Sequence, residues 1–203
     1  MTHQVDTCWT DAGQLLPPAW AACGDAPWAG GTLLTSGYRV RIRADVQAVW
    51  KVVRSVGGDR GWFYAQPLWR RRGMVDRLVG GVGLLRGRRH PEQIGVGDVI
   101  DFWRVSEVED GRKLVLLAEM KFPGQATLTF EVTPCADETC ELALLSRFMP
   151  QGMAGIGYWY GFYPFHELIF FGMAKAIARA TGHPIHGKSE RFTPRAVRSC
   201  ALP

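Results

Sequence analysis

The chain has 203 residues, of which 47% are hydrophobic and 21% charged, and its net charge is +5. This composition excludes disordered and collagen-like chains and predicts one globular domain with a sizeable core. No stretch reaches the ~18 consecutive apolar residues of a membrane helix, and the N-terminus lacks a signal-peptide pattern, so we expect a cytoplasmic protein with no transmembrane segment.

Residues 1–31 are rich in Pro, Gly and Ala, which predicts an irregular N-terminal arm. Indole rings seldom stay exposed, so we expect the arm to pack on the body through Trp9, Trp20 and Trp28. Residues 32–43 alternate between apolar and basic side chains and predict a strand. Asp45 is a suitable N-cap for a short amphipathic helix that ends at Gly57.

Residues 58–91 are the least regular part of the chain. Apolar side chains between Leu68 and Val82 could line one side of a helix, with Arg70, Arg71 and Arg72 among its polar positions. The sequence GGVGLLRG follows, beside further arginines, and leaves a phosphate-binding loop open as an alternative. It matches neither GxGxxG nor GxxxxGK[ST] and follows a helix, which favours a connection with a solvated basic face.

Residues 97–150 change to a period of two. Turn signals separate four predicted strands, at residues 98–108, 114–121, 126–134 and 141–148. Such short connections predict a consecutive antiparallel meander with one apolar face.

Residues 155–182 predict a long helix whose wide apolar face needs the meander as its partner. Pro164 suits the first turn of this helix, and Gly182 suits its end. The remaining residues, 183–203, are basic and interrupted by prolines, so we expect a flexible basic tail.

An antiparallel sheet curled around a long C-terminal helix is the helix-grip arrangement, an α+β fold. The stretches GGDRGWFYAQPLWRRRGMVDRLVGGVGLLRGRRHPEQIGVGDVIDFWRV, AEMKFPGQATLTFEV and YWYGFYPFHELIFFGM resemble the DUF2867 family, itself similar to the START/Bet v 1-like (SRPBCC) superfamily. The resemblance covers roughly residues 30–180 and predicts one SRPBCC-like domain at residues 32–182.

The resemblance implies a hydrophobic cavity between the sheet and the C-terminal helix. It holds a small hydrophobic ligand and, in some relatives, supports cyclisation, dehydration or hydrolysis. Family members often follow an NAD(P)-binding Rossmann domain, so an NAD(P)-binding oxidoreductase is a possible partner. The 203 residues contain no such domain, so we do not expect its redox activity to carry over.

A curved sheet cannot close fully on one helix, so aromatic side chains either fill the gap or line it. The candidate ligand-binding residues are Trp62, Tyr64, Phe102, Trp103, Phe130, Phe148, Trp159, Tyr160 and Phe165.

Catalysis would need polar groups among these rings. His166 lies at the edge of the helix's apolar face and could act as an acid or base near neutral pH. Tyr158 and Arg147 are the other candidates, with Arg147 able to hold an anionic group if it turns inward. Arg104 is a further ionisable candidate, whereas Asp101, Glu119 and Lys121 are expected on a solvated or salt-bridged outer face.

We expect no metal site and no cofactor, because no metal-ligand run or nucleophile motif is present. The five cysteines are odd in number and scattered, which predicts free thiols: Cys8, Cys23, Cys135, Cys140 and Cys200.

Three functions stay open at this point. The preferred hypothesis is a binder of a small hydrophobic or aromatic molecule. The alternatives are a cofactor-free cyclase or dehydratase-type enzyme in the same cavity, and a basic module that docks an acidic partner or lipid surface. The sequence leaves open whether the protein is an enzyme. We expect no nucleic-acid partner, because the basic residues are not interleaved with aromatics.

Overall fold

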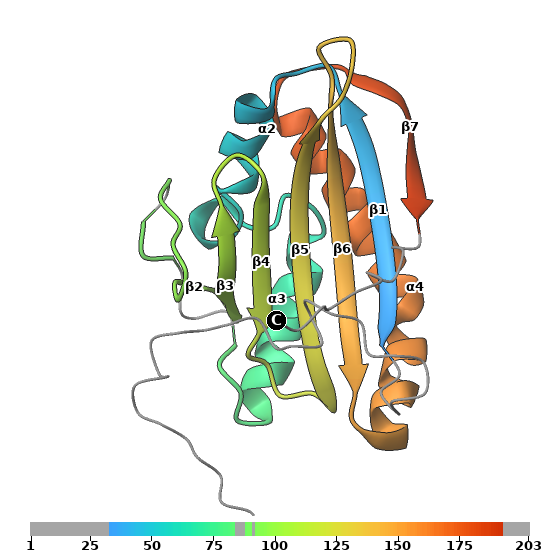
Figure 1. Ribbon diagram of the computed structural model, residues 1–203. Coiled ribbons are helices and arrows are strands. Elements are labelled where there is room, and N and C mark those ends of the chain that lie inside the picture. The colour runs from blue at the N-terminus through green and yellow to red at the C-terminus, as the bar shows by residue number, and fades with distance from the viewer. Residues whose placement is uncertain (1–32, 84–87, 91, 193–203) are drawn as a thin grey trace, which may run out of the picture.

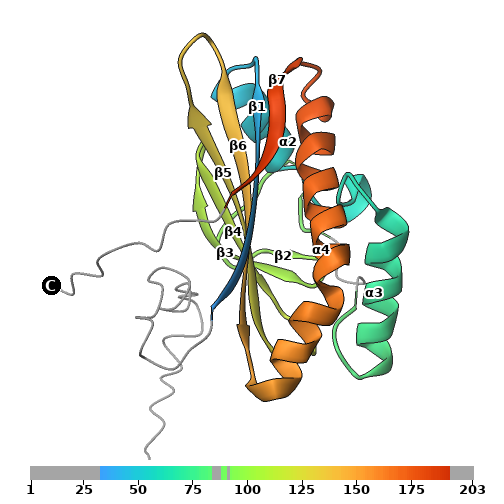
Figure 2. The same ribbon diagram turned by 90° about the vertical axis from the view of Figure 1, so that its right-hand side faces the viewer.

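The computed structural model describes residues 33–83, 88–90 and 92–192. These residues form one antiparallel sheet with three α-helices on one of its faces (Figures 1 and 2). The predicted N-terminal arm lies outside the described residues. The elements are β1 (Leu34–Ile42), α2 (Val46–Val53), η2 (Gly58–Arg60), α3 (Gln66–Leu78), β2 (Val99–Ile100), β3 (Trp103–Glu109), β4 (Lys113–Ala118), β5 (Gly124–Pro134), β6 (Cys140–Pro150), α4 (Gly152–Ala180) and β7 (Ile185–Phe192).

The sheet order is β2-β3-β4-β5-β6-β1-β7. Consecutive strands β2 to β6 pair as the predicted meander, and β1 then pairs antiparallel with β6, matching Leu34 with Phe148 and Ile42 with Cys140. The long helix α4 lies across the concave side (Figure 2). The predicted α+β helix-grip fold is therefore confirmed.

The first strand and helix form where the sequence predicts them. The side chain of Asp45 accepts a hydrogen bond from the backbone N–H of Ala48 at 2.8 Å, which caps α2. Four residues of α2 are buried against the sheet: Val49, Trp50, Val52 and Val53. Trp50 also donates its indole N–H to Asp110 at 2.6 Å, which joins α2 to the turn after β3.

The prediction of one strand over residues 98–108 is wrong in one respect, because the structure divides it into β2 and β3. Asp101 has a φ of 54°, in the left-handed region, and turns the chain sharply between them. Alternation alone cannot show this turn, since the apolar residues on either side continue the pattern.

Helix α4 begins at Gly152, so the prediction that Pro164 occupies its first turn is wrong. Gly155 packs so closely on the chain that a Cβ there would lie 2.4 Å from the carbonyl oxygen of Pro123. This contact fixes the start of the helix directly after β6. Pro164 lies inside the helix and removes one backbone bond, to the carbonyl of Tyr160 on the exposed side.

The expected tail after Gly182 is wrong for Ile185–Phe192, which form β7 at the edge of the sheet. β7 pairs antiparallel with β1, and Arg39 forms an ion pair with Glu190 at 2.8 Å. Backbone pairing with an open edge requires no apolar alternation, which is why the sequence pattern does not predict this strand. Residues 193–203 lie outside the described part.

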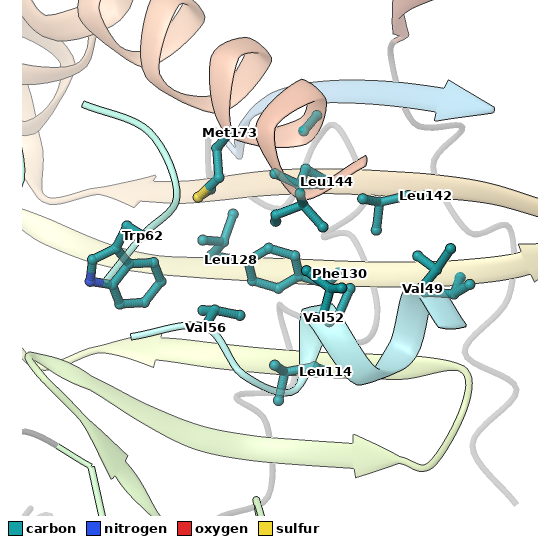
Figure 3. Close-up of a cluster of buried hydrophobic side chains, with 14 of the residues drawn as sticks. Val49, Val52, Val56, Trp62, Leu114, Leu128, Phe130, Leu142, Leu144 and Met173 are labelled. Carbon is teal, nitrogen blue, oxygen red and sulfur yellow. The ribbon is translucent and has the colours of Figure 1, made fainter. Parts of the chain in front are cut away.

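The core lies between the sheet, α2 and α4 (Figure 3). Leu128 and Leu144 lie near Met173 of α4, and Phe130 and Leu142 lie beside α2; each of these four side chains is at most 1% exposed. This is the apolar face that alternation in the last two meander strands predicts. This core occupies the part of the space between the sheet and α4 that lies next to α2.

Candidate functional site

A cavity of about 300 Å³ lies where α3 and the N-terminal half of α4 cover the sheet. Its sheet wall comes from inward-pointing side chains of β3, β4, β5 and β6, such as Trp103, Ala118, Ala126 and Phe148. Its other walls come from α3 and α4, which lie next to each other on that side (Figure 2). The lining residues are Leu68, Trp69, Arg71, Arg72, Val75, Phe102, Trp103, Ala118, Met120, Phe122, Ala126, Ser146, Phe148, Tyr158, Trp159, Phe162, Phe165, His166, Ile169 and Phe170.

Stacked rings build the wall between β6 and α4. Phe148 of β6 lies against Trp159 of α4, with centroids 5.6 Å apart and planes inclined by 7°. Tyr158 stacks on Phe122, with centroids 5.9 Å apart. Such pairs are stabilised beyond their buried area and restrict ring rotation, so this wall has a defined shape.

A second group of rings closes the end of the cavity next to β2. Trp69 of α3 lies 5.9 Å from Phe102 and 6.4 Å from Phe170 of α4, measured between centroids. Trp62, fully buried, stacks behind Phe102 and donates its indole N–H to Asp101 at 2.9 Å. The aromatic wall is thus anchored on a hydrogen-bonded carboxyl group.

Asp101 was expected on the solvated outer face, and the structure contradicts this. Its carboxyl group is buried, and burial raises its pKa, although hydrogen bonds from Trp62 and the backbone of Gly58 act in the opposite direction. It supports the aromatic residues from behind. Glu119, by contrast, forms an ion pair with Arg104.

Arg72 carries a positive charge into the aromatic wall. Its guanidinium carbon lies 5.2 Å from the ring centroid of Tyr158, 5.8 Å from that of Phe162 and 6.0 Å from that of Phe122. A guanidinium over several ring faces is held by cation–π attraction. The side chain therefore has a fixed place at the boundary between α3 and α4.

The hydroxyl of Tyr158 has a raised pKa because it is buried, while the charge of Arg72 and a hydrogen bond from it act to lower the pKa. A tyrosine hydroxyl can also donate its hydrogen to an acceptor in the cavity, which Tyr158 lines.

His166 is a neutral imidazole at neutral pH. Burial, followed by the nearby charge of Arg72, lowers its pKa to about 4. Its ring lies between Trp159 and Phe170, with centroids 5.4 and 5.7 Å away. Its Nδ1 is buried and has no hydrogen-bond partner within the described ranges.

Two more polar groups line the cavity. The indole nitrogen of Trp103 is buried without a partner in the described part of the chain, and Ser146 points inward from β6. Among the described lining residues the charged side chains are Arg71 and Arg72, and none is Asp or Glu. The cavity is therefore apolar with hydrogen-bond donors and positive charge.

The structure brings together most of the residues that the sequence singles out. The lining contains seven of them: Phe102, Trp103, Phe148, Tyr158, Trp159, Phe165 and His166.

Five candidates lie elsewhere. Trp62 is in the layer behind the lining, Phe130 is in the core beside α2, and Tyr64 packs against Gly172 of α4. Tyr160 is 64% exposed on the outer side of α4. Arg147 belongs to the opposite face of the sheet, because it alternates with the inward-facing Ser146 and Phe148; burial lowers its pKa there.

Arg72 is the main residue that the sequence analysis missed. It was grouped with Arg70 and Arg71 on a solvated basic face. However, its spacing from Leu68 and Val75 is four and three, which places all three on one stripe of α3. The sequence signal that could have identified Arg72 was a charged residue within an apolar stripe of α3.

The glycine-rich segment after α3 binds an anion, but that anion is the protein's own Asp76. The buried carboxylate of Asp76 accepts backbone N–H bonds from Gly83 at 2.9 Å and from Lys121 at 2.7 Å. A Cβ at Gly81 would lie 2.3 Å from the same carboxylate. The segment thus fixes α3 to the chain after β4, which accounts for Gly81 and Gly83 without a phosphate.

Within the described ranges no three metal-ligating side chains lie together. Cys135 and Cys140 are free thiols, and burial raises the pKa of Cys140 to about 11. The other cysteines lie outside the described residues. No helix in the described part is both long and apolar enough to span a membrane.

Sequence comparison identifies a family for most of the chain. Residues 28–173 match the profile of a family described as "Protein of unknown function (DUF2867)". No curated protein sequence matches this one.

Several solved structures are similar in arrangement. Truncated norcoclaurine synthase from Thalictrum flavum has 13% identity and a TM-score of 0.47, covering 74% of this chain and 94% of that one. The Zhui aromatase/cyclase from "Streptomcyes sp. R1128" has 12% identity and a TM-score of 0.45, covering 74% and 94%. Ara h 8.0201 has 10% identity and a TM-score of 0.45, covering 74% and 98%. At these values the comparison carries no inference about a ligand or reaction.

Proposed function

This chain belongs to the DUF2867 family, and we propose that it binds a small hydrophobic or aromatic molecule in the cavity between the sheet, α3 and α4. The description of that family names no function, so the proposal rests on the residues of the site. One observation carries the proposal. The space between these elements is not filled by the protein's own side chains, although its walls are almost entirely apolar and aromatic.

The size and composition of the cavity support this proposal. Binding sites for small molecules occupy about 300–1,000 Å³ and are lined mainly by apolar and aromatic side chains with a few polar groups. This cavity has a volume of about 300 Å³, and its few polar groups include His166, Tyr158 and Ser146. The size suits a compact guest of a few fused rings more than an extended lipid.

The alternative of a basic docking module requires a filled core, so it does not explain this cavity.

Binding of a guest also accounts for apolar lining residues that are exposed to solvent. Phe165 of α4 is 51% exposed and Val75 of α3 is 51% exposed, yet both also line the cavity. They therefore lie at its mouth, where a guest would enter.

Native mass spectrometry of the protein purified from its own host tests the proposal. We expect a stoichiometric small hydrophobic molecule that is released on denaturation and raises the melting temperature when added back. A mass equal to the polypeptide alone, together with no thermal shift across a set of one- to three-ring aromatic compounds, would contradict it.

A cofactor-free lyase or cyclase activity is a second candidate, and His166 favours it. His166 lines the cavity, and a neutral imidazole can take a proton from a guest or deliver one. The test is the chemical fate of the recovered guest. If the protein is such an enzyme, His166→Gln should still bind the guest but no longer convert it. Recovery of the unchanged guest from both the unmodified protein and His166→Gln would contradict this second candidate.

A further inference from the structure

We infer that the guest of this cavity is a carboxylic acid in its ionised form, with an apolar ring system against the aromatic walls and its carboxylate on the guanidinium of Arg72. This inference rests on the proposed function, since it names the class of guest for the same cavity. It begins from the charges that the described lining residues carry.

Arg72 has no counterion in the described part of the chain. None of the ion pairs among the described residues includes it. Asp76, one helical turn away and the nearest carboxylate along α3, instead binds the backbone N–H groups of Gly83 and Lys121. The positive charge of Arg72 is therefore balanced by ring faces and solvent alone.

The charge of a guest determines whether its interaction with Arg72 is favourable. An apolar guest would displace water from around the guanidinium and leave a charge without a partner, which is costly. A cationic amine would add repulsion from Arg72 and Arg71, with no acidic lining residue to offset it among those described. A carboxylate would supply the missing counterion, and the planar guanidinium matches a carboxylate with two parallel hydrogen bonds.

The neighbours of Arg72 complete a donor set for this anion. Tyr158 lines the cavity beside Arg72, and its hydroxyl group can donate a hydrogen to a guest oxygen. Ser146 of β6 adds a hydroxyl group on the sheet wall. Donors from α3, α4 and β6 thus line the cavity, as recognition of an acceptor group requires.

Four probes with one ring system test the inference by calorimetric titration: 2-naphthoate, 2-naphthamide, 2-naphthylmethylammonium and 2-naphthyl phosphate. For the unmodified protein we expect 2-naphthoate to bind about tenfold or more tightly than 2-naphthamide, because its hydrogen bonds are charge-assisted. The ammonium probe should bind most weakly. In Arg72→Gln the preference for the carboxylate over the amide should fall to about twofold or less.

Arg70→Gln is the matched control, because it removes the same charge from an exposed position of α3 that does not line the cavity. It should keep the carboxylate preference. Retained binding of 2-naphthamide shows that Arg72→Gln is folded, and Arg72→Lys, which keeps the charge without the planar fork, should keep part of the preference.

The outcomes separate the two proposals. Equal binding of naphthoate and naphthamide, or an unchanged preference in Arg72→Gln, would overturn the carboxylate inference and leave the cavity proposal in place. Tighter binding of the phosphate would overturn the assignment to a carboxylate. Failure of all four probes would contradict the proposed function and the inference with it.

Discussion

The guanidinium of Arg72 lies over the ring of Tyr158, with 5.2 Å between the guanidinium carbon and the ring centroid. Arg72 belongs to α3 and Tyr158 to α4, so this contact joins two helices through residues that are 86 positions apart in the sequence. It places a charge and a hydroxyl group side by side in a wall made otherwise of apolar side chains. The site therefore depends on how α3 is held against the sheet and α4.

The first prediction concerns pH and His166. Its pKa is 6.5 when unperturbed and about 4 in the folded protein, so the unfolded chain binds more protons between these values. Stability is then lost as pH falls from 6.5 towards 4. Between pH 7 and pH 5 the unmodified protein should lose about 1–2 kcal/mol more unfolding free energy than His166→Phe. Urea unfolding at both pH values measures this, and equal losses would contradict it.

The second prediction concerns the carboxylate that holds α3. Asp76→Ala leaves the buried N–H of Gly83 and the partly buried N–H of Lys121 without their acceptor, which should lower the unfolding free energy by about 2–4 kcal/mol. Asp76→Asn, which keeps one acceptor oxygen, should lie between. Asp59→Ala removes an exposed carboxylate and should change stability by less than about 0.5 kcal/mol. Chemical denaturation gives all three values, and similar values for Asp76→Ala and Asp59→Ala would refute the role of Asp76.

The third prediction concerns the close approach of Tyr64 to α4. A Cβ at Gly172 would lie 2.3 Å from a ring carbon of Tyr64, whereas a Cβ at Gly161 of the same helix meets nothing within 4 Å. Gly161→Ala should stabilise the protein by about 0.5–1 kcal/mol through helix propensity. Gly172→Ala should destabilise it by about 1–2 kcal/mol, since the ring must move.

The double variant with Tyr64→Ala isolates the clash. In that background, Gly172→Ala should stabilise the protein as Gly161→Ala does, because the ring is gone. Thermal unfolding of the four proteins gives the coupling. If Gly172→Ala is stabilising without Tyr64→Ala, the packing described between this residue and α4 is wrong.

Most strands and helices were predictable from the sequence because their residues show a local pattern of apolar spacing or capping. Alternation predicts the inward side chains Leu128, Phe130, Leu142 and Leu144, and Asp45 marks the start of α2. The edge strand β7 was not predictable, since it depends on backbone pairing with β1. The start of α4 was misplaced because Pro164 is tolerated on an exposed side of a helix that tertiary contacts hold.

The site was predictable in kind but not in detail. Aromatic enrichment pointed to Phe102, Trp103, Phe148, Trp159 and Phe165, all of which line the cavity. Composition cannot separate these from Trp62 and Phe130, which are equally aromatic but lie one layer deeper or in the core. That distinction depends on where α3 leaves a gap, which is a property of the assembled fold.

Titration of the unmodified protein and Ala118→Phe with 2-naphthamide tests the central claim most directly. Ala118 lines the cavity on β4, so a phenyl ring there would occupy the space of a guest, whereas Thr133→Phe places the same ring on an exposed position of β5. The account predicts binding to the unmodified protein and to Thr133→Phe, and a loss of about tenfold or more in Ala118→Phe. Equal binding by all three proteins, with Ala118→Phe folded, would show that the guest does not occupy this cavity.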